Sequence, residues 1–153
     1  MKLRKNLGAV VVAVAVASCA GVVYADDIRA VVPANAPEAI GPYSHGIRAG
    51  NTVYVSGQLP TDASGKLHND APIDEQTRLV LNNIKNVLAA EGLTMDNVVA
   101  TTVYMKDLDE FSAMNEAYAT FFTEGAPPAR ATVQVARLPR DVSVEIGAIA
   151  VKP

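Results

Sequence analysis

The chain has 153 residues, of which 50% are hydrophobic, and it carries a formal net charge of −3. The length is that of one domain and the apolar content excludes a disordered chain, while 10 Gly, 9 Pro and a single Cys exclude collagen-like and disulfide-rich classes. The acidic balance argues against a nucleic-acid partner, because nucleic-acid-binding domains usually carry a basic face.

The first 25 residues differ from the rest and predict a secretory signal peptide. They contain three basic residues and no acidic one, so residues 26–153 have a net charge of −6. Residues 7–17 are only Leu, Gly, Ala and Val, and Ala25 is a small residue suited to cleavage before Asp26. This layout is typical of exported proteins, and the bacterial periplasm is the expected compartment.

Two other interpretations of the leader stay open. The sequence that ends at Cys19 resembles a bacterial lipoprotein box, in which Cys19 would carry a lipid anchor. Residues 6–25 are uncharged and approach the length of a membrane span, although Ala, Gly, Ser and Val dominate them. All three interpretations place residues 26–153 outside the cytoplasm, and after processing we expect no membrane span.

The domain that follows begins with a proline-rich tether over residues 26–42, which excludes a long helix. Residues 28–32 could still pair as an edge strand. Next, the segments 44–49 and 51–56 flank a Gly-Asn turn at Gly50, and Val alternates with other residues in the second segment. This pattern predicts a β-hairpin.

Two amphipathic helices are predicted farther along the chain. In the first, apolar residues recur at helical spacing from Ile73 to Leu88, acidic residues fill the first turn, and Gly92 ends the segment. The second helix is expected to begin with Asp109 as its cap. Its apolar face comprises four residues at helical spacing: Phe111, Met114, Tyr118 and Phe121.

Three further strands are predicted at residues 97–105, 131–136 and 142–151. The element order is then β-β-α-β-α-β-β, which indicates an α+β domain with two helices on one face of a mixed sheet. Two helices leave the opposite face of that sheet uncovered. Burial of the open face against further copies of the chain is the economical solution, so we expect an oligomer.

Arg130 and Glu145 are the candidate chemical groups, because each is a charge inside an otherwise apolar strand. With a period of two, Arg130 shares a face with Thr132 and opposes Val133, while Glu145 opposes its apolar neighbours. A guanidinium grips a carboxylate through two donors, and a partly desolvated carboxyl group exchanges protons near neutral pH. A cleft holding both would suit a small molecule with a carboxylate beside a protonatable atom; solvated positions at a sheet edge are the alternative interpretation.

The sequence gives no sign of a metal or cofactor site. His45 and His68 lack the spacing of metal ligands and are expected to be exposed loop residues. Glycine-rich phosphate-binding motifs are absent as well. We therefore expect neither a metal nor a cofactor.

Five motifs occur in chain order: GPYS at 41–44, VSGQLP at 55–60, TTVYMKDL at 101–108, PARAT at 128–132 and ARLPRDVSVEI at 136–146. On these motifs the chain resembles the RidA/YjgF family. The resemblance covers essentially all of residues 30–153 with compatible spacing.

The resemblance implies a chorismate-mutase-like fold that assembles as a homotrimer. In such a trimer the sheets line a central barrel, the helices lie outside, and clefts form between subunits. The implied activity is that of a 2-iminobutanoate/2-iminopropanoate deaminase, which hydrolyses 2-aminoacrylate and related 2-imino acids to 2-keto acids and ammonia. The implied partners are small imino and keto acids and further copies of the chain.

The resemblance also implies roles for individual residues. Arg130 matches the arginine that binds the substrate carboxylate, and Glu145 matches the acid that positions water or moves protons. The other matching positions line the same cleft: Tyr43, Ser56, Gly57, Asn115 and Thr132.

Thr132 stands where many members have cysteine, which argues against covalent chemistry there, and its main-chain N–H could help to hold the substrate carboxylate. The leader is a second departure, because the substrates usual in the family arise in the cytoplasm. Two alternatives therefore stay open: a non-catalytic protein that binds small carboxylates, and a chaperone-like, protein-binding trimer.

Overall fold

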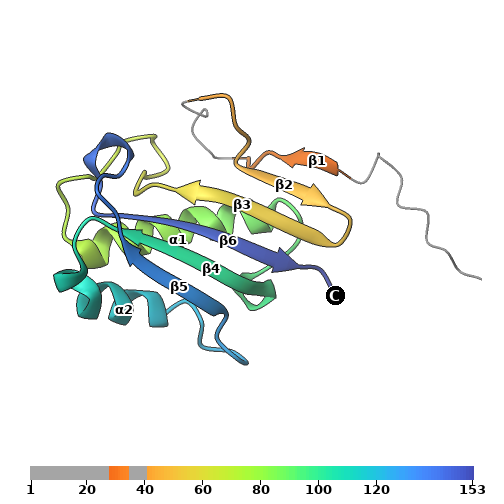
Figure 1. The fold of residues 1–153 in the computed structure, drawn as a ribbon. Helices are drawn as coiled ribbons and strands as arrows, with labels where there is room; N and C mark the ends of the chain where they lie inside the picture. The colour runs from red at the N-terminus through yellow and green to blue at the C-terminus, as the bar shows by residue number, and fades with distance from the viewer. Residues whose placement is uncertain (1–27, 35–40) are drawn as a thin grey trace, which may run out of the picture.

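The computed structural model describes residues 28–34 and 41–153. The predicted signal peptide, the lipoprotein box at Cys19 and the cleavage site before Asp26 lie outside the described residues and stay predictions. The described part forms one sheet with two α-helices on one of its faces, as Figure 1 shows. This arrangement confirms the predicted α+β fold.

In chain order the strands and helices are β1 (Ile28–Val31), β2 (Gly46–Ala49), β3 (Thr52–Gln58), α1 (Ile73–Ala89), β4 (Val98–Met105), α2 (Phe111–Ala119), β5 (Ala129–Gln134) and β6 (Val144–Val151). Short 3₁₀ helices lie at Met95–Asn97, Leu108–Glu110 and Pro139–Asp141.

The strands follow the order β1-β2-β3-β6-β4-β5 across the sheet. Neighbouring strands run antiparallel except β4 and β5, which are parallel, so the sheet is mixed as predicted. β1 pairs with β2 at one edge, which confirms the edge strand expected at residues 28–32. α1 packs against α2, β3 and β6, and both helices lie on the same face of the sheet (Figure 1).

The core lies between the helices and this face of the sheet. In β6 the residues Val144, Ile146 and Ala148 are buried, and in β4 the residues Val103 and Met105 are fully buried. The alternate positions of both strands are more exposed, as the twofold period of a strand requires. α1 contributes eight buried residues at helical spacing, which confirms the predicted amphipathic helix.

The predicted start of the second helix is wrong. Asp107, not Asp109, accepts a hydrogen bond from a main-chain N–H two residues on, because its own backbone is extended while residues 108–110 form a 3₁₀ turn. The α-helix therefore begins at Phe111, which is 39% exposed, and ends before Phe121.

The strand boundaries also shift by one to two residues. Residues 95–97 form a 3₁₀ turn closed by a capping box at Thr94, so β4 starts at Val98. β5 runs from Ala129 to Gln134, two residues earlier than predicted. β6 begins at Val144 rather than at residue 142, because Val142 closes the preceding 3₁₀ turn, Pro139–Asp141, as its C-cap.

The face of the sheet opposite the helices is open in the single chain. Tyr54 of β3 and Val133 of β5 lie on this face and are 49% and 42% exposed. Large apolar side chains exposed on an open sheet face are typical of an interaction surface. Across the described ranges, neither helix is long and apolar enough to pass through a membrane.

A buried ion pair fixes the N-terminal edge of the sheet. The side chain of Glu91, which is 3% exposed, accepts hydrogen bonds from Arg29 of β1 at 2.6 Å and from Arg48 of β2 at 3.2 Å. One buried carboxylate just beyond α1 thus joins two edge strands to the helical layer.

Replacing Glu91 by Gln is expected to lower the free energy of unfolding by about 1–3 kcal/mol, because two arginines lose their charge partner while Arg29 stays half exposed to water. Denaturant unfolding at fixed protein concentration measures the change. The matched control is Asp74→Asn, which removes the solvent-exposed i,i+4 pair with Arg78 on α1 and should change the midpoint little. Equal stability of both variants would show that the Glu91 cluster does not hold the edge.

Candidate functional site

Six of the sequence-predicted site residues line two separate hollows. Four of them, Tyr43, Ser56, Gly57 and Glu145, line a hollow of about 210 Å³ together with Leu59 and Pro139, and we call it the carboxylate half-site. The other two, Asn115 and Arg130, line a hollow of about 450 Å³ together with Tyr118, Ala119, Phe122, Pro127 and Pro128, and we call it the arginine half-site.

An irregularity in β3 shapes the carboxylate half-site. Val55 pairs with Ala148 of β6, but the next pair joins Gln58 to Ile146, so one extra residue of β3 is accommodated at this point. The bulge contains Ser56 and Gly57. Bulges bend a strand locally and re-aim its side chains, and they occur frequently beside active sites.

Hydrogen bonds to the segment before β2 hold Ser56 in the bulge. Its main-chain N–H donates to the carbonyl of His45, and its hydroxyl donates to the carbonyl of Ser44 at 2.7 Å. Tyr43, 45% exposed, packs edge-on to the half-buried His45 ring at a centroid distance of 6.4 Å. The GPYS and VSGQLP motifs therefore meet in space, and the Tyr43 ring borders the hollow.

Glu145 enters the carboxylate half-site from β6. Its strand neighbours Val144 and Ile146 are buried beneath the helices, so Glu145 points to the open face, where it pairs in register with Tyr104 of β4. No residue of the described ranges donates a hydrogen bond to its carboxylate. Burial without a compensating partner raises the pKa of Glu145 above the ordinary glutamate value of 4.5.

Arg130 forms the centre of the arginine half-site. Its guanidinium donates a hydrogen bond to Asn115 Oδ1 of α2 at 2.8 Å and lies 4.5 Å from the centroid of the Tyr118 ring. The Phe111 ring lies 5.7 Å away. Stacking on aromatic rings and one amide contact hold the guanidinium in place and leave donors free for an anion.

Thr132 lies on the same face as Arg130, as predicted. It pairs in register with Val103 of β4, whose side chain is fully buried on the helix face. Within the described residues its hydroxyl oxygen is buried and has no hydrogen-bond partner. A buried hydroxyl without a partner is costly, so this position suits a group supplied from outside the single chain.

One chain does not bring Arg130 and Glu145 together. Arg130 pairs with Thr101, whose hydroxyl contacts Tyr118 of α2, so Arg130 lies on the helix face of the sheet. Glu145 lies on the opposite, open face. A cleft that holds both groups therefore does not form within one chain, and the cleft between subunits that the resemblance implies stays a prediction.

Leu59 and Pro139 belong to the carboxylate half-site but were missed from the sequence. Leu59 lies in the VSGQLP motif and Pro139 lies in the ARLPRDVSVEI motif. Membership of these motifs was the sequence signal that could have identified them as site residues. Pro139 is followed by Arg140 and Asp141, both with positive φ of 55° and 58°, a conformation that is strained for residues other than glycine. An ion pair between Asp141 and Lys106 at 2.9 Å holds this tight turn.

Two polar side chains of α1 brace the loops that border the carboxylate half-site. Asn83 donates to the carbonyl of Leu59 at 3.0 Å and also to that of Thr61. The fully buried Gln76 donates to the carbonyl of Ala71 and accepts from the main-chain N–H of Ser143. The helix thus fixes the positions of both loops.

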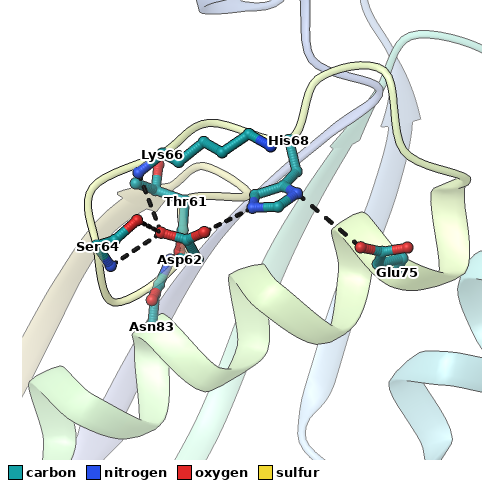
Figure 2. A network of polar contacts seen from close by, with 7 residues as sticks. All are labelled: Thr61, Asp62, Ser64, Lys66, His68, Glu75 and Asn83. Atoms are coloured by element: carbon teal, nitrogen blue, oxygen red, sulfur yellow. Dashed lines mark hydrogen bonds and ion pairs between the residues drawn. The ribbon is translucent and has the colours of Figure 1, made fainter.

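The interpretation of His45 and His68 as exposed loop residues is wrong, because both are half-buried. His68 belongs to a cluster of polar contacts. Its Nε2 lies 2.8 Å from Asp62 Oδ2, and its Nδ1 lies 4.0 Å from Glu75 of α1 (Figure 2). The other oxygen of Asp62 accepts hydrogen bonds from the main chain and hydroxyl of Ser64 and from the main chain of Lys66. Ser64 and His68 both contact the carboxylate rather than each other, so the cluster braces the loop and is not a nucleophile–base pair.

Replacing Asp62 by Asn is expected to remove an acid-sensitive part of the stability. Hydrogen bonds from His68 and Ser64 hold the pKa of Asp62 well below its ordinary value of 3.8. A lowered pKa in the folded state stabilises the protein fully above the unfolded-state value, and this contribution is lost as the pH falls below it. The wild type should exceed Asp62→Asn in unfolding free energy at pH 6, and the gap should narrow from about pH 4 downwards. Parallel loss of stability in both proteins would contradict this assignment.

Comparisons with known proteins match nearly the whole described chain. The sequence model of a family described as endoribonuclease L-PSP matches residues 33–152. A Pyrococcus horikoshii protein named RutC family protein PH0854 is 49% identical over 77% of this chain and 93% of its own length. A Salmonella typhimurium protein named 2-iminobutanoate/2-iminopropanoate deaminase is 45% identical over 81% of this chain and 98% of its own length. The crystal structure of E. coli TdcF with bound serine is 41% identical, with a TM-score of 0.77 over 82% of this chain and 99% of that chain.

Proposed function

Because the chain belongs to the endoribonuclease L-PSP family, the RidA/YjgF family that its motifs resemble, we propose that it hydrolyses reactive 2-imino acids and their enamine forms to 2-keto acids and ammonia. The observation that carries the proposal is the pair of half-sites. One presents a guanidinium with free donors, and the other presents a partly desolvated carboxyl group without a polar partner. A 2-imino acid needs both groups, since its carboxylate lies beside an imine that must take up protons.

The proposed cleft forms between subunits of a homotrimer. The open sheet face exposes Tyr54 and Val133, and burial of that face against other copies would remove this apolar surface from water. The same assembly would bring the arginine half-site of one subunit to the carboxylate half-site of its neighbour. Half-sites on opposite faces of one sheet support this arrangement, because neither half can complete the other within its own chain.

The proposed reaction needs water and proton transfer only. Arg130 binds the substrate carboxylate with its two-donor fork, while Glu145 takes a proton from the attacking water as oxygen bonds to the imine carbon. Glu145 then gives that proton to nitrogen, which yields a carbon bearing both a hydroxyl and an amino group. In the second half, Glu145 carries the hydroxyl proton to nitrogen, the C–N bond breaks, the C=O bond forms and ammonia leaves.

The raised pKa of Glu145 suits a group that both accepts and donates protons in this reaction. A general acid–base group works best when its pKa approaches the operating pH, and burial moves Glu145 in that direction. Glu145→Gln should lose turnover, because an amide cannot exchange the protons. The folded protein disfavours the charged form of Glu145, so this variant should have an unchanged or higher free energy of unfolding at pH 7.

The test of the function uses purified residues 26–153 and 2-iminopropionate, generated from alanine by an amino-acid oxidase in the presence of semicarbazide. A deaminase diverts the imine to keto acid before semicarbazide traps it, so semicarbazone formation should slow at low protein concentration. Unchanged semicarbazone formation with several imino acids would reject the enzymatic proposal.

A non-catalytic protein that binds small carboxylates is the second candidate, and a relative described with bound serine favours it. Such a protein needs Arg130 but not Glu145. Calorimetric titration with a 2-keto acid separates the two functions. Binding that survives in Glu145→Gln, together with a wild type that does not turn over imines, would select the binding protein.

We propose export for this activity, with processing before Asp26 and release into the periplasm. The basic start, the apolar run over residues 7–17 and the small Ala25 support it. The mass of the protein recovered from fractionated cells that express the full chain is the test. An N-terminus at Asp26 supports the proposal, a lipid-modified Cys19 selects the anchored alternative, and an intact leader in the cytoplasm overturns both.

A further inference from the structure

Glu145 lies against a position where the chain has no side chain. A Cβ atom built at Gly57 would lie 1.9 Å from Glu145 Oε1, 2.8 Å from Cδ and 3.0 Å from Cγ. Real atoms do not approach this closely, so the carboxylate fills the space that the missing side chain leaves. Gly57 does not have positive φ in this strand, and turn geometry therefore does not explain the glycine.

Space, rather than polar contacts, sets the position of the Glu145 carboxylate. Within the described ranges it has no hydrogen bond or ion pair to another side chain. It borders two hollows, the carboxylate half-site on one side and a larger hollow of about 330 Å³ on the open sheet face on the other. The other titratable side chains that line these hollows are Tyr43, Tyr54 and Tyr104.

The bulge in β3 produces this approach. It lies between the pairs Val55–Ala148 and Gln58–Ile146, so Gly57 faces β6 at an irregular position. A regular ladder would align one residue of β3 with each residue of β6. The extra residue brings the Gly57 backbone up to the carboxylate instead.

We propose that Gly57 is the positioning residue for Glu145: the missing side chain creates the niche that holds the carboxylate at the border of the carboxylate half-site. The proposal rests on the proposed function, because the niche matters for turnover only if Glu145 moves protons there. Gly57→Ala would displace the end of a flexible side chain rather than backbone, so the fold should tolerate it while the carboxylate should not stay in place.

The kinetic test is Gly57→Ala in the imine assay. A misplacement of about 1 Å costs about a hundredfold in rate, so kcat should fall by about ten- to a hundredfold while KM changes little, because Arg130 still binds the substrate. The pH profile should change as well, since the group that carries the protons has left its buried niche. A rise in KM with unchanged kcat would overturn the proposal, as would full activity.

Two further variants distinguish an effect on the position of the Glu145 carboxylate from a general steric effect of the added methyl group. If Gly57 acts only through the carboxylate, Gly57→Ala should cause no further loss in a Glu145→Gln background. A matched control is Gly147→Ala on β6, where a new Cβ would meet only ordinary contacts, 3.5 Å from the Val55 carbonyl and 3.9 Å from the Gly57 nitrogen. Gly147 lies on the open face that the proposed trimer buries, so light scattering first checks the oligomer size, and a control that keeps the wild-type size should retain kcat. Additive losses in the double variant would overturn the proposal.

A crystal structure of Gly57→Ala tests the niche without any assay. The carboxylate should move by more than about 1 Å, since a Cβ at this place excludes its present position. An unmoved carboxylate overturns the proposal whatever the activity. If the wild type proves inactive but the carboxylate moves as expected, the proposed function fails and the niche itself stands.

Discussion

Arg130→Ala is expected to lower kcat/KM for 2-iminopropionate by about a hundredfold or more, mainly through a higher KM. Loss of one member of a desolvated charge pair costs about 2–5 kcal/mol in recognition, and a small substrate carboxylate has no second cation among the residues that line the described half-sites. The semicarbazide competition assay measures the effect. Arg130→Lys should recover only part of it, because an ammonium keeps the charge but lacks the planar two-donor fork.

The matched control for Arg130 is Arg78→Ala, the same truncation on the exposed face of α1, where Arg78 pairs with Asp74. It should leave turnover unchanged. Light scattering should give the same oligomer size for both variants, since Arg130 contacts Asn115 and Tyr118 of its own chain. Full activity of Arg130→Ala would remove the arginine from the mechanism and with it the carboxylate-binding role of this half-site.

The helices and strands could be predicted well from the sequence, because the spacing of apolar residues within a segment depends only on that segment. The twofold pattern of β6 correctly places Glu145 opposite Val144 and Ile146, and the helical spacing of α1 correctly identifies its buried face. The ends of elements were less predictable. Asp107 and Asp109 are both acidic residues suited to capping, but Asp107 has the extended backbone and caps the 3₁₀ turn at Leu108–Glu110, while α2 follows that turn without a side-chain cap.

The alternation of apolar and polar residues could not show whether Arg130 and Glu145 lie on the same face of the sheet. In β6 the apolar residues face the helices, but in β5 the apolar Val133 faces the open side, as its register with Tyr104 shows. Both faces of this sheet carry apolar residues, so an apolar side chain does not indicate which face is the core. That ambiguity is itself informative, because a sheet with two apolar faces is expected when other subunits cover the second one.

The close approach of Gly57 to Glu145 was also outside the reach of sequence reasoning. The two residues are far apart in the chain, and they meet only because β3 pairs with β6 through a bulge. Register and bulges depend on long-range pairing, which a local pattern does not encode. The motifs VSGQLP and ARLPRDVSVEI marked both residues as belonging to a site, but only the fold shows why one of them lacks a side chain.

The strongest consequence of half-sites on opposite faces concerns mixed oligomers of two variants that each have very low activity at substrate concentrations far below KM. Arg130→Ala keeps the carboxylate half-site, and Glu145→Gln keeps the arginine half-site. If each cleft combines halves from neighbouring subunits of a cyclic trimer, every mixed trimer contains one intact cleft, whichever variant is present twice. Co-expression with two different tags and purification on both should therefore yield about one-third of the wild-type activity.

This complementation separates assembly from chemistry. Mixed oligomers made from two differently tagged copies of Arg130→Ala should stay at the low activity of that variant, which controls for tags and for contaminating activity. If both residues acted within one chain, no mixed oligomer of the two variants would contain an intact site, and activity would stay at the level of the parents. Recovery of about a third of the activity would thus establish in one experiment that the cleft spans two subunits and that Arg130 and Glu145 act on the same substrate molecule, because neither half works without the other.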